Sequence, residues 1–413
     1  MTNNKIFISI ASYRDKQLIP TIEDCIKKAK NPENLVFAIG WQHEDDENLD
    51  DYMDRSNFRI LSYHSSQSKG VNWMRYKLQK LWDGEDYYFQ LDSHHRFIKN
   101  WDVELIDMYK KFKYKKSIIT TYGTVFNPEE NTFSDDFQKI APKNFFGQGI
   151  FYIPHYLPKD LKRPVRARFI SGHFIFTHGQ FCEDVQYDPY LYFHGEETNL
   201  SVRSFTKGYN IYHPHKNIQW HEYIRNDKTK HWDEHTSWSD HEKKTVKRIE
   251  QLLRQVDHGI DLGEFDLGDE RTLEEYEKYA NVNFKDKVIG PDAEKAIEPP
   301  EPRELDDLIV PELIDIPLKT FKYVVKWPRS IINNIEDDIL SISVIVDGIM
   351  NETLFRKDIT PEDDPEYFTS GSDAKNDIIV EIEAREEPTK FIIWPYSESK
   401  GWIDKLEIAN ITT

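Results

Sequence analysis

The sequence predicts an α/β protein, with a mostly parallel sheet in its first part and a small β-sandwich in its second. Short apolar strands alternate with helical periodicity over the first hundred residues, whereas alternating, β-branched segments recur near the end. A proline-rich stretch lies between the two patterns. These observations predict domains at 1–287 and 306–413, joined by a linker at 288–305.

In the first part, strand and helix alternate along the chain. Strands are predicted at 6–10, 35–39, 59–63 and 87–91, and helices at 18–30 and 72–81. This is βαβ order, which predicts a mostly parallel sheet. The strand at 87–91 ends directly at Asp92. Since such sheets bind ligands at the carboxyl ends of their strands, Asp92 is a candidate site residue.

The second part begins after a run that cannot form regular structure. Three prolines between Ile297 and Arg303 favour extended backbone and interrupt helix or ladder pairing. Beyond them, the segments 321–327, 340–346 and 377–383 alternate apolar and polar residues or are rich in β-branched ones. This spacing predicts the β-sandwich.

Composition and charge limit the classes of protein and of binding partner that fit this chain. Of 413 residues, 38% are hydrophobic and 14% aromatic, enough for packed cores. The net charge of -19 disfavours nucleic acid and anionic membranes as partners. The segment 288–413 holds 28 acidic and 13 basic side chains, and all 15 histidines lie between His43 and His258. Imidazole chemistry therefore belongs to the first part.

The cysteines and apolar runs indicate the compartment. Cys25 and Cys182 are too few for a disulfide framework and lack the paired spacing of a zinc site. No run approaches the roughly 20 apolar residues of a membrane span, and the first residues have no targeting pattern. We therefore expect a cytoplasmic protein without a membrane anchor.

The segment Gln90-Leu-Asp-Ser-His-His-Arg-Phe97 is the most informative for chemistry. Alternate residues of extended backbone point the same way, so Asp92 and His94 can face one ion. A carboxylate and an imidazole with open coordination positions suit Mn²⁺ or a similar divalent metal that holds a diphosphate. The alternative is that Asp92 caps a helix and the histidines lie on the surface.

A third ligand and a phosphate-binding cation can come from a distant segment, Ile218 to Arg225. His221 follows a predicted strand there, and the Arg225 guanidinium, four residues on, suits phosphate oxygens. Four other histidines lie nearby, so a histidine-rich surface loop is the competing interpretation: His213, His215, His231 and His235.

Several of these segments occur in the order of one enzyme family: Ile8 to Asp15, Gln90 to Asp102, Ser171 to Phe176, Tyr192 to Glu197 and His221 to Arg225. From about Lys5 to Lys287, the chain resembles the Skp1-type hydroxyproline and polypeptide Ser/Thr α-N-acetylglucosaminyltransferases. More distantly, it is similar to the polypeptide GalNAc-transferases.

The resemblance implies a GT-A fold with a Rossmann-like nucleotide-sugar half. It also implies a UDP-GlcNAc donor, a divalent metal, Mn²⁺ or Mg²⁺, and retention at the anomeric carbon. By the same analogy, Asp92, His94 and His221 bind the metal, and Arg225 meets the departing diphosphate.

The run Tyr192-Phe-His-Gly-Glu-Glu197 offers two carboxylates for catalysis, Glu196 and Glu197. Either can lie beside the sugar or the acceptor hydroxyl, with a slight preference for Glu196. Alternatively, both complement the dipole of a helix that begins there.

The remaining candidates concern the donor. Tyr13 can stack on uracil or simply cover the sheet edge. The segment Lys69 to Arg75 resembles the family's glycine-then-arginine segment that opens a helix, which makes Arg75 a donor-site candidate. Two stretches depart from the family: Val71-Asn72 stands in place of Pro-Cys, and Gly172-His173 in place of a double glycine. Because of these two departures, the resemblance does not fix the identity of the substrate. The predicted donor-binding residues are Ala11, Ser12, Tyr13, Arg14, Arg75, Asp92, Gly172 and His173.

The sequence thus predicts a metal-dependent retaining glycosyltransferase that moves a sugar from a UDP-sugar to a hydroxyl of a protein or glycan. The alternative is a sugar-binding or scaffolding protein that keeps the fold without turnover. For residues 306–413 we expect acceptor recruitment, glycan binding or self-association into a homo-oligomer.

Overall fold

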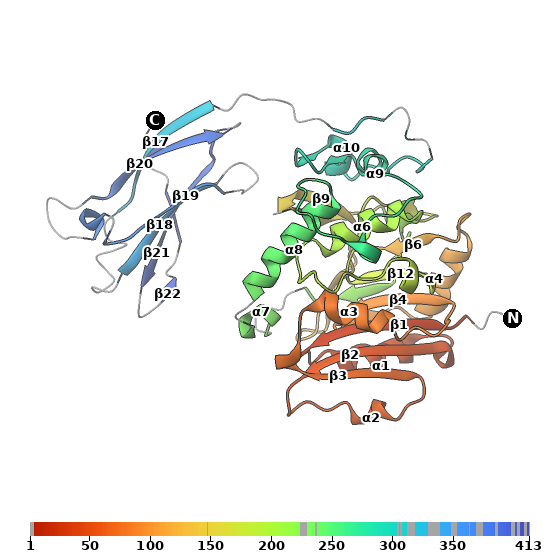
Figure 1. Cartoon of the computed structure of the whole chain (residues 1–413). Helices are drawn as coiled ribbons and strands as arrows, with labels where there is room; N and C mark the ends of the chain where they lie inside the picture. Colours follow the sequence, from red (N-terminus) through yellow and green to blue (C-terminus); the bar gives the residue numbers. More distant parts are fainter. Residues whose placement is uncertain are drawn as a thin grey trace. The chain divides into compact units, whose positions relative to one another are not determined.

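The chain forms two compact units, Met1–Leu313 and Ile314–Thr413. The computed structural model (Figure 1) describes residues 4–146, 148–223, 229–235, 238–303, 305, 308–311, 319–328, 339–347, 353–362, 364–368, 375–384, 387–397, 401–402, 405–408 and 411–412.

The proline-rich stretch expected to be a linker belongs to the first unit, and the division falls after it. Ion pairs and a hydrogen bond join it to the rest of that unit. Glu298 forms ion pairs with Arg163 and Arg166, and Glu301 forms one with Arg166. Lys139 donates a hydrogen bond to the carbonyl of Ala296 in the same stretch. No helix or strand forms at 297–303, where the three prolines lie, yet this part of the stretch still packs onto the rest of the first unit.

An eight-stranded sheet forms the centre of the first unit (Figure 1). Its spatial order is β11 (Val165–Arg166), β13 (Asn210–His213), β6 (Ser117–Thr120), β12 (Phe174–His178), β4 (Tyr87–Asp92), β1 (Ile6–Tyr13), β2 (Leu35–His43) and β3 (Phe58–His64). The strands β4, β1, β2 and β3 are parallel neighbours, and β12 is antiparallel to both β4 and β6. The predicted α/β class and each predicted strand and helix of the first hundred residues are confirmed.

Helices cover both faces of this sheet because its strands are apolar on both sides. Along β1, Ile6, Ile8 and Ile10 belong to one core cluster, whereas Phe7 belongs to another. The first cluster includes residues of α1 (Leu18–Lys28) and α4 (Trp101–Lys110). The second includes residues of α3 (Val71–Gln79), α5 (Phe181–Asp184) and α6 (Glu196–Thr206). The result is a three-layer arrangement.

A smaller sheet brings distant segments together beside β4. Its order is β5 (His95–Phe97), β14 (Gln219–His221), β7 (Thr124–Asn127) and β8 (Thr132–Phe133). The strands β5 and β14 are antiparallel, and His95 lies directly opposite His221. This pairing carries a segment near residue 220 to the end of β4.

Further helices and strands complete the first unit. They are α2 (Asp50–Met53), the hairpin β9 (Gln138–Phe146) and β10 (Gly149–Tyr156), α7 (His231–Glu234), α8 (Trp238–Leu252), α9 (Leu273–Ala280), β15 (Val282–Asn283), β16 (Val288–Ile289) and α10 (Pro291–Glu294). None of the helices described is long and apolar enough to cross a membrane.

The second unit is β-rich, as predicted. One sheet contains β20 (Asp377–Ala384), β17 (Lys319–Lys326) and β24 (Ile411–Thr412). The other contains β19 (Thr353–Ile359), β18 (Ile339–Asp347), β21 (Lys390–Ser397), β22 (Gly401–Trp402) and β23 (Leu406–Glu407). Val325, Val344, Val380 and Ile393 are fully buried in one core cluster that both sheets share, which is the packing of a β-sandwich.

Candidate metal and sugar-donor site

The candidate site lies at the carboxyl end of β4. Asp92 is the last residue of that strand, next to Ala11 of β1, and the chain then turns through Ser93 and His94 into β5. Thr21 of α1 holds this turn: its hydroxyl donates to the carbonyl of Ser93 and accepts from the backbone N–H of His95, each at 2.9 Å. The turn is therefore anchored on both sides.

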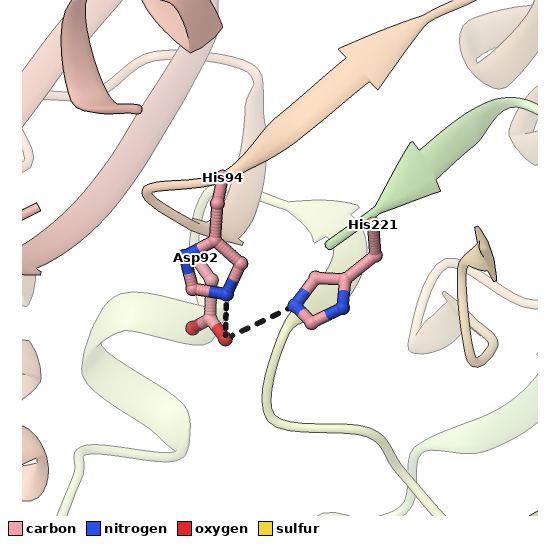
Figure 2. Close-up of side chains that lie close together, drawn as sticks. All are labelled: Asp92, His94 and His221. Atoms are coloured by element: carbon pink, nitrogen blue, oxygen red, sulfur yellow. Dashed lines mark ion pairs between the residues drawn. The ribbon is translucent and has the colours of Figure 1, made fainter. Parts of the chain in front are cut away.

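Asp92, His94 and His221 point toward one another (Figure 2). One ligand atom from each lies within 4.8 Å of the others. The Nε2 atoms of His94 and His221 lie 3.7 and 3.5 Å from Oδ2 of Asp92. Both imidazoles are buried, and Asp92 is partly exposed. The structure thus brings together the three residues predicted as ligands, and one carboxylate with two imidazoles suits a divalent transition metal.

A second carboxylate orients His94. Oδ2 of Asp15 lies 2.8 Å from Nδ1 of His94 and accepts a hydrogen bond from the hydroxyl of Ser93. Because an ionised carboxylate only accepts, the imidazole proton lies on Nδ1, and Nε2 is the atom turned toward Asp92. Asp15 ends the segment Ile8 to Asp15 that carries the family resemblance, but the sequence did not predict it as a site residue. The signal that could have identified it is its position in the loop that follows the first strand, two residues after β1 ends at Tyr13.

Arg75 joins the metal-site carboxylate to the catalytic candidates. Its guanidinium is buried and donates to Oδ1 of Asp92 at 2.6 Å and to Oε1 of Glu196. Burial opposes the charge of Asp92, but the hydrogen bond with His221 and the charge of Arg75 hold its pKa well below the usual value. Burial raises the pKa of Glu196, and Arg75 counteracts that effect. Asp92 and Glu196 are thus coupled through one cation.

Glu196 and Glu197 have different surroundings although they are adjacent. The hydroxyl of Tyr187 donates to Oε1 of Glu196 at 2.9 Å. Glu197 accepts from the backbone N–H of Gly172 at 2.8 Å and from the hydroxyl of Tyr122 at 3.0 Å. Burial raises the pKa of Glu197 to about 7. Glu196 is paired with a cation, whereas Glu197 can exchange a proton near neutral pH.

Gly172 is a close-approach position. A Cβ there would lie 2.8 Å from Oε1 of Glu196 and 3.1 Å from Nη1 of Arg75, so a larger residue would displace that ion pair. The carbonyl of Gly172 also accepts a hydrogen bond from the Gln90 side chain at 2.6 Å. The glycine therefore ties the start of α6 to β4.

The residues predicted to bind the donor base extend from the end of β1. Ser12 is buried, and its carbonyl accepts from Gln42. The hydroxyl of Tyr13 donates to Glu234 of α7 at 2.5 Å, and Arg14 forms an ion pair with the same carboxylate. In this structure Tyr13 and Arg14 thus contact α7, and stacking of Tyr13 on a base stays a prediction. Arg225 lies outside the described residues.

The remaining candidate, His173, lies beside His221 rather than in the Arg75 network. Their ring centroids are 4.3 Å apart. Tyr122, Tyr187 and Gln90 complete the network but were not predicted. Neither spacing nor residue type distinguished them from ordinary core positions.

Comparisons with known proteins give a family match and structural similarities. The family model described as Glycosyltransferase (GlcNAc) matches residues 5–54 and 46–286. No curated protein matches the sequence. The crystal structure of GalNAc-T7 with UDP, GalNAc and Mn²⁺ aligns with a TM-score of 0.47 and 15% identity, over 61% of this chain and 48% of that one. The aligned region is thus about half of GalNAc-T7. S. aureus TarS 1–349 aligns with a TM-score of 0.37 and 10% identity, over 62% and 76% of the two chains.

Proposed function

The chain belongs to the GlcNAc glycosyltransferase family, and from that premise we propose that it is a metal-dependent, retaining enzyme that transfers GlcNAc from UDP-GlcNAc to a hydroxyl of a protein or glycan. The observation that carries the proposal is the convergence of Asp92, His94 and His221 at the carboxyl end of β4. Retention, the sugar and the Skp1-type acceptor class come from the sequence resemblance.

The donor set fits a divalent cation, with Mn²⁺ as the first choice and Mg²⁺ as the second. A metal bound by Asp92, His94 and His221 would supply positive charge beside the leaving diphosphate. Asp15 keeps the proton of His94 on Nδ1 and so leaves Nε2 directed at the ion. Arg75 keeps Asp92 ionised and oriented. Asp15 and Arg75 therefore hold His94 and Asp92 in the protonation state and orientation that a metal ion requires.

The two adjacent glutamates are proposed to have different roles in the reaction. Glu196, held by Arg75 and Tyr187, is suited to position the sugar or the acceptor hydroxyl. Glu197, with its pKa near 7, is suited to exchange a proton with a hydroxyl. Arg225 is proposed to meet the diphosphate, on the resemblance alone.

The test is release of UDP from a panel of UDP-sugars with Mn²⁺, with and without EDTA. We expect release from UDP-GlcNAc, its loss with EDTA, and a reduction of at least about 10²-fold in Asp92→Asn. Asp107→Asn, a substitution at an exposed position of α4, is the matched control and should retain wild-type release. Binding of UDP-GlcNAc without any release would instead favour the sugar-binding alternative.

A further inference from the structure

His173 occupies the position at which the sequence departs from the double glycine of the family it resembles. The side chain is buried, with an exposed fraction of 7%. Its Nδ1 lies 2.8 Å from the hydroxyl of Ser171, and its Nε2 accepts from the backbone N–H of Gly123 at 3.1 Å. The second contact requires an unprotonated Nε2, so Nδ1 carries the proton and donates to Ser171. Both edges of the ring are therefore held in place.

The faces of the His173 ring contact two aromatic rings of the candidate site, those of His221 and Tyr122. The centroid of His173 lies 4.3 Å from that of His221, with an angle of 30° between the ring planes. It lies 5.2 Å from the ring of Tyr122 at 25°, and Tyr122 donates to Glu197. One buried imidazole thus contacts both a candidate metal ligand and the partner of a candidate catalytic carboxylate.

The strand that carries His221 is short. The strand β14 has three residues, paired to β5 on one side and to β7 on the other. Backbone pairing fixes the position of the His221 Cα but leaves its χ2 torsion to be set by packing. The rings of His173 and Tyr223 are both 4.3 Å from His221. The rings of His94 and His95 lie 4.6 and 4.7 Å from it, and its Nε2 lies 3.5 Å from Oδ2 of Asp92. Side-chain packing, to which His173 contributes one of the two closest rings, therefore acts with the ladder to set where its Nε2 points.

We propose that His173 is a positioning residue for the metal site, and that its ring packing holds the imidazole of His221 in the orientation that a divalent cation requires. The inference rests on the proposed metal dependence. It assigns the substituted glycine position a role in this chain: the imidazole fills space that would otherwise let His221 rotate.

The test is calorimetric titration of the full-length protein with Mn²⁺ alone, together with thermal unfolding. In His173→Ala we expect Mn²⁺ affinity to fall by about 10-fold or more, since residues that orient metal ligands typically contribute 10–100-fold. In His173→Phe, which keeps an aromatic ring but loses the acceptor for Gly123, affinity should stay within about threefold of wild type although the melting temperature falls.

His213 provides the matched control. It is also a buried histidine whose Nε2 accepts from a backbone N–H, that of Ile140, and whose Nδ1 contacts an oxygen, the carbonyl of Thr120. His213→Ala and His213→Phe should lower the melting temperature and leave Mn²⁺ affinity unchanged.

Two outcomes would overturn the inference while leaving the metal proposal intact. One is a folded His173→Ala protein with wild-type Mn²⁺ affinity. The other is a tenfold loss in folded His173→Phe, which would assign the effect to the hydrogen bond rather than to the ring; this variant decides the matter if His173→Ala does not fold. Absence of Mn²⁺ binding by the wild type would overturn the metal proposal itself, and this inference with it.

Discussion

The two units bury different kinds of side chain. The core of the first unit includes buried charged and polar groups at the site, among them Arg75, His94, Glu196 and His221. In the described part of the second unit, the buried polar side chains are Ser343 and Ser397, and the core cluster is apolar or aromatic. Burying polar groups costs free energy unless they are paired. Their concentration in the first unit is therefore typical of a functional site, whereas the second unit has the apolar core of a structural domain.

The largest expected difference between the units is the cost of removing an arginine that is buried in the first unit compared with one that is exposed in the second. Arg75→Met would leave Asp92 and Glu196 without their shared cation, and we expect UDP release to fall by at least about 10³-fold and the free energy of unfolding by about 3 kcal/mol. UDP release and urea unfolding measure the two effects. The matched change in the second unit is Arg356→Met, which breaks an exposed ion pair with Asp358 and should cost less than about 1 kcal/mol. Equal costs would contradict the comparison.

A truncation in the apolar core should affect stability and not chemistry. Ile393 is fully buried in the second unit, so Ile393→Ala should lower the free energy of unfolding of that unit by about 3 kcal/mol. UDP release should stay within twofold of wild type, because the candidate residues belong to the other unit. The measurement is thermal unfolding, with tryptophan fluorescence and UDP release followed together. A parallel loss of both would show that the chemistry depends on the second core.

The pH dependence of stability should reveal the buried carboxyl of the first unit. Because the pKa of Glu197 is about 7 in the folded chain and lower when unfolded, the folded state binds more protons between roughly pH 4.5 and 7. The contribution of Glu197 to stability is therefore present at low pH and is lost as pH rises through about 7. Its size is about 3 kcal/mol, from the difference between the pKa of about 7 in the folded chain and the ordinary pKa of a glutamate. Glu197→Gln should remove this component in urea unfolding at pH 5 and 8, and an unchanged difference between the two pH values would rule out Glu197 as its source.

The smallest effect is expected from removing the second unit. A protein ending at Leu313 should retain UDP release within about threefold, if the second unit only recruits acceptor or mediates self-association. A protein ending at Lys287 should unfold more readily, because it lacks the ion pairs of Glu298 and Glu301 with the arginines at 163 and 166. Loss of UDP release from the folded longer form would assign the second unit a part in the donor chemistry.

Local patterns in the sequence predicted most of the elements. Helical spacing predicted the helix at 18–30, and α1 buries Leu18, Ile22 and Cys25 on one side; alternation in 377–383 predicted β20. These predictions succeeded because periodicity depends on which face of one element meets a core, and neighbours in sequence carry that information. The linker prediction differed from the structure because proline content reports local backbone freedom and not whether the segment docks.

For the site, the sequence by itself determined the residue types and the edge of the sheet: a carboxylate and an imidazole after β4, and two adjacent glutamates after a glycine. Only the tertiary structure decided which distant groups join them. His221 was one of several histidines in its region until the pairing of β14 with β5 brought it to Asp92. The links from Arg75 to Glu196 and from His173 to His221 likewise cross segments far apart in sequence. Such contacts depend on the three-dimensional packing of whole elements, which no local pattern encodes.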